Sequence, residues 1–267
     1  MSIEFHPSNF SEIIFVSVSA LVILGHNLWL VAKDEKDTII VEVNTSDNFP
    51  LSDSAVKPER VANFRLVWAN ESIPVINYEV KENSLIASVK PNKNACLAAL
   101  ELRPHPITLE SEKFAGYIKS EDAEKFVAPQ FVSGKTTAPQ RESYTKYAKV
   151  LLDAPGEKQS NDFSFAAGHR LEIIPQANPS TVQAGEKLPV KVLFEGNPIS
   201  GLRVSSGCEN LNNGKYAAHT RTDEDGLATV EISGKGLWFV RTHFIRPHAD
   251  ADNFDWESFW ASLTFRI

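Results

Sequence analysis

The sequence has little of what several large protein classes require. Only 2 of its 267 residues are cysteine, and they stand far apart, at Cys96 and Cys208, without a C-x-x-C spacing. This scarcity excludes a disulfide-rich scaffold and a local thiolate metal site. One disulfide between the two cysteines and two separate buried thiols both fit the sequence, because a disulfide requires Cα atoms that lie close together.

Positive charge is also scarce. The 27 Lys and Arg residues are outnumbered by 34 Asp and Glu residues, which gives a net charge of -7. Nothing concentrates the basic residues in the way that binding to a phosphate backbone requires. We therefore expect no nucleic-acid partner.

Sequence signatures of catalysis are missing too. The chain has no nucleophile elbow, no glycine-rich phosphate loop and no convincing acid–base pair, so we do not expect an enzyme. It also lacks the H-x-H and H-E-x-x-H spacings, so any metal site must combine residues that are distant in the sequence. The acidic stretch TDEDG at residues 222–226 lacks the closing Glu of a calcium loop. It predicts instead a tight turn with Gly226 at positive φ.

The sequence has one long apolar run, at residues 13–24, which is shorter than the about 20 residues that cross a bilayer. Its length suits the hydrophobic part of a secretory signal, and Gly25 is a small residue at a plausible cleavage position. The residues before the run depart from this pattern, because they contain no Lys or Arg and include Glu4 and Glu12. We predict a signal peptide over residues 1–25 and a chain, periplasmic or otherwise exported, that begins at His26; the alternative is a buried N-terminal strand.

Strand patterns dominate after residue 26. Residues 61–68 alternate with period two, which places Phe64 and Leu66 on one face of a strand. A helix is predicted around residues 108–120 from the spacing of Phe114, Tyr117 and Ile118, with Thr108 as its candidate N-cap and Ser120 as the N-cap of a second helix. The predicted first domain, residues 26–174, is therefore β-rich with one or two short helices.

From residue 175 onward, short strands alternate with turns at intervals of eight to twelve residues. This rhythm is typical of a β-sandwich. We therefore predict a mainly β protein whose second domain, residues 175–267, is an immunoglobulin- or transthyretin-like sandwich.

Five segments in a fixed order carry a resemblance to a known group of proteins. They are HNLWL (26–30), RESYTKYAKVLL (141–152), LEIIPQANP with AGEKLPVKVLFEGNPISG (171–201), TDEDGLATVEI with GLWFVRTHFIRP (222–247) and WESFWASLTF (256–265). The combination resembles exported bacterial domains described as periplasmic components of cobalt or nickel uptake systems, relatives of the amino-terminal domain of NikM-like proteins. The resemblance implies a mostly β, periplasmic protein that handles a divalent transition metal beside a membrane transporter, and whose mature chain begins at His26.

An N-terminal histidine offers two metal ligands at once. The free α-amine and the imidazole nitrogen of His26 would close a chelate ring on one ion, and a second histidine would complete a nitrogen set suited to Cu(II) or Ni(II). With the cobalt that the resemblance adds, the expected cofactor is Ni, Co or Cu. His243 is the first candidate for that second ligand, because it lies in the WFVRTH segment that carries the resemblance; on a strand it shares a face with Arg241. His169 and His248 are the next candidates. The alternative is that His26 is an ordinary solvated residue beside a strand.

A second hypothesis rests on aromatic residues. Trp256 and Trp260 share the face of the last strand that is opposite its apolar face. They form either an exposed aromatic patch or a contact between domains. An exposed patch would favour an adhesion or glycan-binding β-sandwich that binds no metal.

Overall fold

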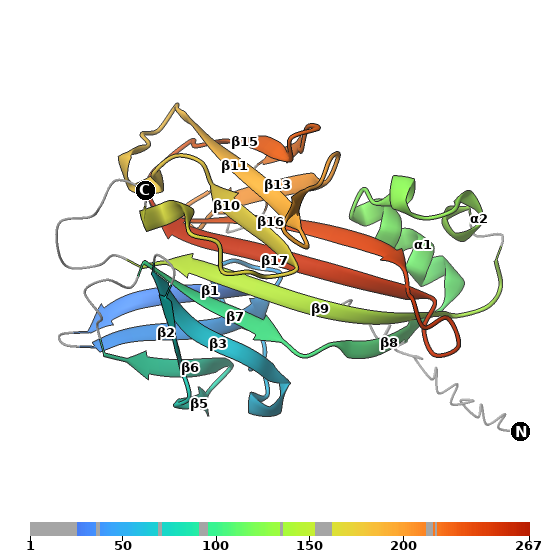
Figure 1. Ribbon diagram of the computed structural model, residues 1–267, viewed down its shortest axis with the longest axis horizontal. Helices are drawn as coiled ribbons and strands as arrows, with labels where there is room; N and C mark the ends of the chain where they lie inside the picture. The colour runs from blue at the N-terminus through green and yellow to red at the C-terminus, as the bar shows by residue number, and fades with distance from the viewer. Residues whose placement is uncertain are drawn as a thin grey trace, which may run out of the picture.

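The computed structural model describes residues 26–267 except 36–37, 69–70, 91–95, 134–135, 153–161, 212–215 and 217 (Figure 1). The predicted signal peptide lies outside the described residues. The fold is mainly β, as predicted, with three sheets and two short α-helices in the described part of the chain. No helix among these residues is long and apolar enough to cross a membrane.

The strands follow one another in this order: β1 (Asn27–Glu35), β2 (Thr38–Ser46), β3 (Val61–Trp68), β4 (Glu71–Pro74), β5 (Tyr78–Lys81), β6 (Ser84–Val89), β7 (Leu97–Leu102), β8 (His105–Leu109), β9 (Gln140–Leu151), β10 (Leu171–Pro175), β11 (Lys187–Phe194), β12 (Asn197–Pro198), β13 (Arg203–Cys208), β14 (Ala218–Arg221), β15 (Leu227–Glu231), β16 (Leu237–Pro247) and β17 (Trp256–Arg266). The α-helices are α1 (Ser111–Ser120) and α2 (Pro129–Val132), and short 3-10 turns lie at Pro58–Arg60, Glu124–Phe126, Asp162–Ser164 and Pro179–Thr181.

One nine-stranded sheet runs through the molecule, in the order β14-β13-β16-β17-β9-β7-β3-β4, with β8 also pairing with β9. At its centre β9 and β17 pair in parallel, with Trp256 opposite Glu142 and Thr264 opposite Val150. The strands on one side of this pair come from the first predicted domain, and those on the other side come from the second. The two parts therefore share a sheet, and the domain boundary at residue 175 stays a prediction.

Two smaller sheets cover opposite faces of the large sheet. The sheet β1-β2-β6-β5 packs over the face that carries Ala148 and Val150. The sheet formed by β10, β11, β12 and β15 packs over the face that carries Tyr147. Successive side chains of a strand point to opposite faces, so neighbouring residues of β9 enter two different cores. Figure 1 shows the β1 and β10 layers on either side of the long β9 and β17 strands.

Helix α1 buries the predicted stripe of Phe114, Tyr117 and Ile118. The Phe114 ring stacks on that of Trp256 in β17, with centroids 5.4 Å apart. The predicted caps are wrong: Thr108 belongs to β8, Glu110 precedes the first turn, and Ser120 is the last residue of α1. No side chain caps the N-terminus of α1, so the local sequence held no strong signal for where it begins.

Two other predictions concern short features. Gly226 has φ +72°, and its N–H donates to the Asp223 carbonyl in the predicted turn, so that prediction is confirmed. Cys96 and Cys208 are both buried and do not form a disulfide with each other, which leaves the interpretation of two buried thiols.

Candidate functional site

One face of the β9–β17–β16 region carries a group of buried polar side chains. We call it the polar face; it comprises Glu142, Lys146, Arg241, His243, Ser258, Trp260 and Ser262. Helix α1 covers one end of this face through Tyr117, whose ring stacks on that of Trp260 with centroids 6.0 Å apart. Strand β1 covers the other end, where Ser262 Oγ donates to the Leu28 carbonyl at 2.5 Å.

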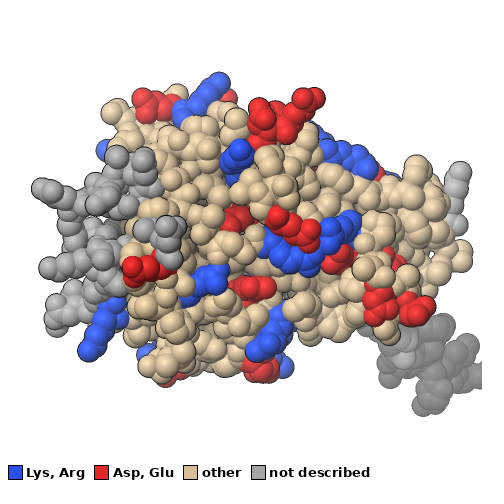
Figure 2. Space-filling model, in the orientation of Figure 1, with Lys and Arg blue, Asp and Glu red and all other residues tan. Residues whose placement is uncertain are grey.

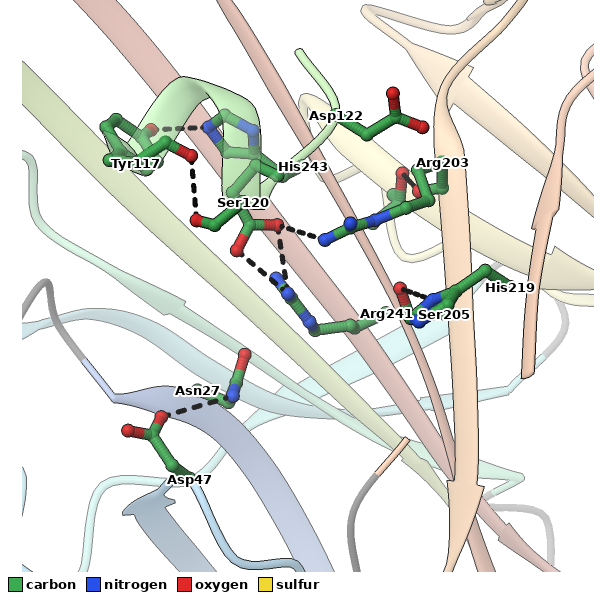
Figure 3. A network of polar contacts seen from close by, with 12 residues as sticks. Asn27, Asp47, Tyr117, Ser120, Asp122, Arg203, Ser205, His219, Arg241 and His243 are labelled. Carbon is green, nitrogen blue, oxygen red and sulfur yellow. Dashed lines mark hydrogen bonds and ion pairs between the residues drawn. The ribbon is translucent and has the colours of Figure 1, made fainter. Parts of the chain in front are cut away.

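Arg241 and His243 lie on the same face of β16, as the strand pattern predicts. The guanidinium of Arg241 is buried and donates through Nη2 to both oxygens of Glu121, each at 2.9 Å (Figure 3). Glu121 follows α1 and also accepts from Arg203 Nη2 at 3.1 Å. Burial would raise the pKa of Glu121, but nearby positive charge, chiefly that of Arg241, outweighs burial and lowers it. The ion pair between Glu121 and Arg241 therefore connects the C-terminal end of α1 to strand β16 of the large sheet.

His243 is buried between Tyr117 and Trp260. Its Nε2 lies 2.6 Å from Tyr117 Oη, and its ring centroid is 4.4 Å from that of Trp260. Burial lowers the pKa of His243 to about 3, so the ring is neutral at physiological pH. Tyr117 also donates to Glu142 Oε1 at 3.3 Å, so its hydroxyl lies between the imidazole and the carboxyl group. The Nδ1 atom of His243 is buried and has no hydrogen-bond partner.

Two further ionisable groups of the polar face have strongly shifted pKa values. Burial raises the pKa of Glu142 to about 7, although Ser258 and Tyr117 both donate to its carboxylate. Burial lowers the pKa of Lys146 to about 7, and the positive charges of Arg60 and Arg241 add to this effect. Lys146 Nζ donates to the His26 carbonyl at 2.5 Å and lies 5.8 Å from the centroid of the Trp260 ring.

His26 lies at the border of this face, just before β1. Its Nδ1 is 3.7 Å from Asp47 Oδ2 and 3.8 Å from Asp53 Oδ2. This Nδ1 atom is buried and makes no hydrogen bond, whereas the side chain as a whole is 17% exposed. Both aspartates are held by neighbours, because Asn27 Nδ2 donates to Asp47 at 3.5 Å and Ser46 Oγ donates to Asp53 at 2.6 Å. One imidazole nitrogen thus faces two carboxylates.

The other predicted ligands lie elsewhere. His169 is buried on the opposite face of β9, with its ring 5.0 Å from that of Tyr147, and burial lowers its pKa to about 3. His248 follows β16, and its Nδ1 accepts the backbone N–H of Asp250 at 2.9 Å. Among the residues that the structure describes, no three His, Cys, Asp or Glu side chains are grouped as a metal site. The metal ligands therefore stay a prediction.

Several residues of this region were not singled out by sequence reasoning. Lys146 and Glu142 could have been found from alternation, because they lie four residues apart on β9 and so share a face. Asp47 and Asp53 lie in the connection after β2 and show no periodic signal. Their position beside His26 depends on how β1 pairs with β2.

The two tryptophans of β17 do face away from its apolar side, as predicted, but helix α1 covers them. Trp256 is buried, with its ring 5.1 Å from that of Phe131. Trp260 is half-buried between Tyr117 and His243. They form a contact between segments and not an exposed aromatic patch. On the outside of the molecule, Figure 2 shows acidic and basic side chains interspersed on the face in view.

Comparison with known proteins places the chain in a family. A family model described as a domain of unknown function, DUF4198, matches residues 23–246. The chain belongs to this family. No curated protein matches it.

Two solved structures show a weak overall likeness. The chain is similar to native alpha-2-macroglobulin from Escherichia coli, domains MG0-NIE-MG1, with 10% identity, 79% of this chain and 91% of that chain covered, and a TM-score of 0.21. It is also similar to the D0-D1 domain of intimin, with 12% identity, 91% and 99% covered, and a TM-score of 0.22. TM-scores this low carry no argument about this chain.

Proposed function

We propose that the chain is an exported protein that binds a divalent transition-metal ion at His26 and serves metal uptake. Nickel and cobalt are the first candidates, and copper is the third. The observation that supports this proposal is the position of His26 Nδ1, which is buried, has no hydrogen-bond donor or acceptor, and lies within 3.8 Å of two carboxylates. A buried polar atom without a partner is uncommon and points to a missing ligand.

No three metal-ligating side chains of the described residues are grouped as a metal site, so the proposed ion would have to draw together the donors that lie nearest His26. One imidazole nitrogen and the carboxylates of Asp47 and Asp53 are three donors, and a free α-amine at His26 would add a fourth donor from the backbone. The amine and the imidazole of one residue close a chelate ring, which reduces the entropy cost of ordering the site. Nitrogen donors favour late first-row metals over magnesium and calcium. In this proposal Asp47 and Asp53 replace the second histidine that the sequence pattern predicts.

Electrostatics allow a second interpretation of the same contacts. A protonated His26 would form ion pairs with Asp47 and Asp53, and no metal would be needed. The glycan-binding alternative has less support, because α1 covers the tryptophans on which it depends. The resemblance to periplasmic components of cobalt and nickel uptake systems favours the metal and suggests a membrane transporter as partner.

The test compares two forms of the protein, one beginning at His26 and one retaining Gly25. Isothermal titration with Ni(II), Co(II) and Cu(II) should show one site in the first form, and the extra residue should abolish it. Asp47→Asn and Asp53→Asn in the first form should each weaken binding about tenfold or more. His248→Ala is the matched control and should leave the affinity unchanged.

The outcomes separate the components of the proposal. Equal binding by both forms would show that the amine takes no part. Absence of binding by either form would leave only the ion-pair interpretation and overturn the metal function. The export prediction has its own measurement, which is mass spectrometry of the N-terminus of protein recovered from the periplasmic fraction.

A further inference from the structure

Arg241 has hydrogen-bonding capacity that the described protein does not use. Its Nη2 donates to Glu121, and its guanidinium lies over the rings of Tyr216 and Trp260, with Cζ 4.8 and 5.4 Å from their centroids, but its buried Nε and Nη1 atoms make no hydrogen bond. The residue is only 6% exposed. A guanidinium carries five N–H donors, and leaving buried charged donors unsatisfied is costly. Something that can accept hydrogen bonds is therefore expected beside it.

A small cavity lies at this position. Its lining includes Arg241 together with Lys146, Asn27, Trp260 and Ser262. Its volume is about 10 Å³, close to the minimum that holds one water-sized group. The cavity lies between β1, which contributes Asn27, and the polar face, which contributes the other four residues.

The two charged residues that line the cavity, Arg241 and Lys146, are both basic. Three carboxyl groups lie nearby: Glu121 is bound by Arg241 and Arg203, Glu142 accepts from Ser258 and Tyr117 through Oε1, and Asp47 accepts from Asn27. Ser262 Oγ already donates to the Leu28 carbonyl and Asn27 Nδ2 to Asp47, so the groups that would attract an anion are the guanidinium of Arg241 and the charge of Lys146.

We propose that this cavity is a binding site for one small monovalent anion, held between Arg241 and Lys146 beside the ring of Trp260. A cavity of this size limits the candidates to a small ion such as a halide, or to a single carboxylate oxygen that reaches in from outside. The site is independent of the metal proposed at His26, because none of its lining side chains is a proposed metal ligand. Lys146 keeps its hydrogen bond to the His26 carbonyl and contributes its charge.

Tryptophan fluorescence with bromide tests the proposal. Bromide quenches a tryptophan that it touches, and Trp260 lines the cavity, whereas Trp29, Trp238 and Trp256 are buried away from solvent. The fifth tryptophan, Trp68, is half-buried at the end of β3 and is not among the residues that line the cavity, so its quenching should not saturate. At constant ionic strength set with gluconate, quenching of the wild-type protein should contain a saturable component. Chloride should compete with it, and Trp260→Phe should lose it. A titration with acetate distinguishes a carboxylate site, for which acetate competes better than chloride, from a halide site.

Two variants that each remove one positive charge test whether Lys146 takes part in binding the anion. Lys146→Met should raise the half-saturating bromide concentration about tenfold. Lys33→Met removes one positive charge from the exposed part of β1 and should leave the concentration unchanged. Quenching that rises linearly without saturation in the wild type would overturn the proposal and leave a water molecule as the occupant. A saturable component that persists in Trp260→Phe would overturn it as well, since the anion would then bind elsewhere. If Lys146→Met fails to fold, the bromide titrations of the wild type and of Trp260→Phe still test the proposal.

Discussion

Strand β9 carries two buried lysines three residues apart, and their surroundings differ sharply. Lys149 faces the β10 layer and donates to Glu172 Oε1 at 2.6 Å. Glu172 also accepts three backbone N–H groups, from Ala167, Gly168 and His169, at 2.5, 2.9 and 3.2 Å. Both carboxylate oxygens are used, so this cluster is closed.

Lys146 faces the other way, toward α1 and β1, and the groups around it are not all satisfied. Buried atoms without partners occur there on Arg241, His243 and Glu142. A small cavity opens beside them. The closed cluster has the composition of a structural ion pair that ties β10 to the sheet. The open cluster around Lys146 contains buried polar atoms without hydrogen-bond partners, and such atoms are common at ligand-binding sites.

The largest expected effect comes from breaking the closed cluster. Lys149→Met should lower the free energy of unfolding by about 3–5 kcal/mol, because it leaves the Glu172 charge buried without its partner. Urea denaturation followed by circular dichroism measures the change.

A double variant provides the control for this prediction. Combining Lys149→Met with Glu172→Leu should recover much of the loss, since a buried ion pair can often be replaced by apolar groups of similar size. A loss below about 1 kcal/mol for the single variant would mean that the closed cluster does not hold the fold.

The open cluster should show itself in the pH dependence of stability. Burial raises the pKa of Glu142 from 4.5 to about 7, so the folded state holds its proton more tightly than the unfolded state. Its contribution is therefore fully present below pH 4.5 and is lost as the pH rises to about 7. Across that window the loss amounts to about 3 kcal/mol.

Lys146 has the opposite effect on the unfolding free energy, and it acts at higher pH. Its pKa falls from 10.5 to about 7 in the folded state, so its term raises stability as the pH increases from about 7 to 10.5. Below about pH 6.5 the two buried histidines, whose pKa values fall to about 3, raise stability with increasing pH and oppose the Glu142 term. The Glu142 term is therefore measured as the difference between the wild type and Glu142→Gln, and the free-energy cost of that substitution should shrink as the pH rises from 4.5 to about 7. A difference that does not change with pH would show that Glu142 does not titrate in this range.

The smallest effect is expected at an exposed pair. Arg170 and Glu195 form an ion pair in which both side chains are more than 40% exposed. Glu195→Gln should change the unfolding free energy by less than about 1 kcal/mol, and the change should shrink further in high salt. A loss as large as that of Lys149→Met would show that burial is not what distinguishes the two lysine clusters from surface pairs.

The sequence predicted the parts of the fold that depend on local pattern. Alternation identified the strands, and it placed Arg241 beside His243 and Trp256 beside Trp260. Helical spacing identified the buried residues of α1. The start of α1 was missed because no side chain caps it, so the boundary depends on the contact between Phe114 and Trp256.

The candidate site depends on contacts that local patterns do not contain. Periodicity showed which residues share a face but not what covers it, so Trp256 could be exposed or covered on the same evidence. Glu121 meets Arg241 only because α1 lies across the sheet, and Asp47 meets His26 only through the pairing of β1 with β2. Each of these contacts joins residues that are distant in the sequence.

The parallel pairing of β17 with β9 has a consequence for how the chain folds. Without β17 the large sheet would consist of two separate pieces, β14-β13-β16 and β9-β7-β3-β4, each with an unpaired edge. A chain synthesised from its N-terminal side cannot join them until β17 has emerged, and closing so long a loop is slow. Open strand edges attract other strands, so the unfinished chain would depend on chaperones during that interval. The last long strand, β17, is therefore the element that joins the two halves of the large sheet.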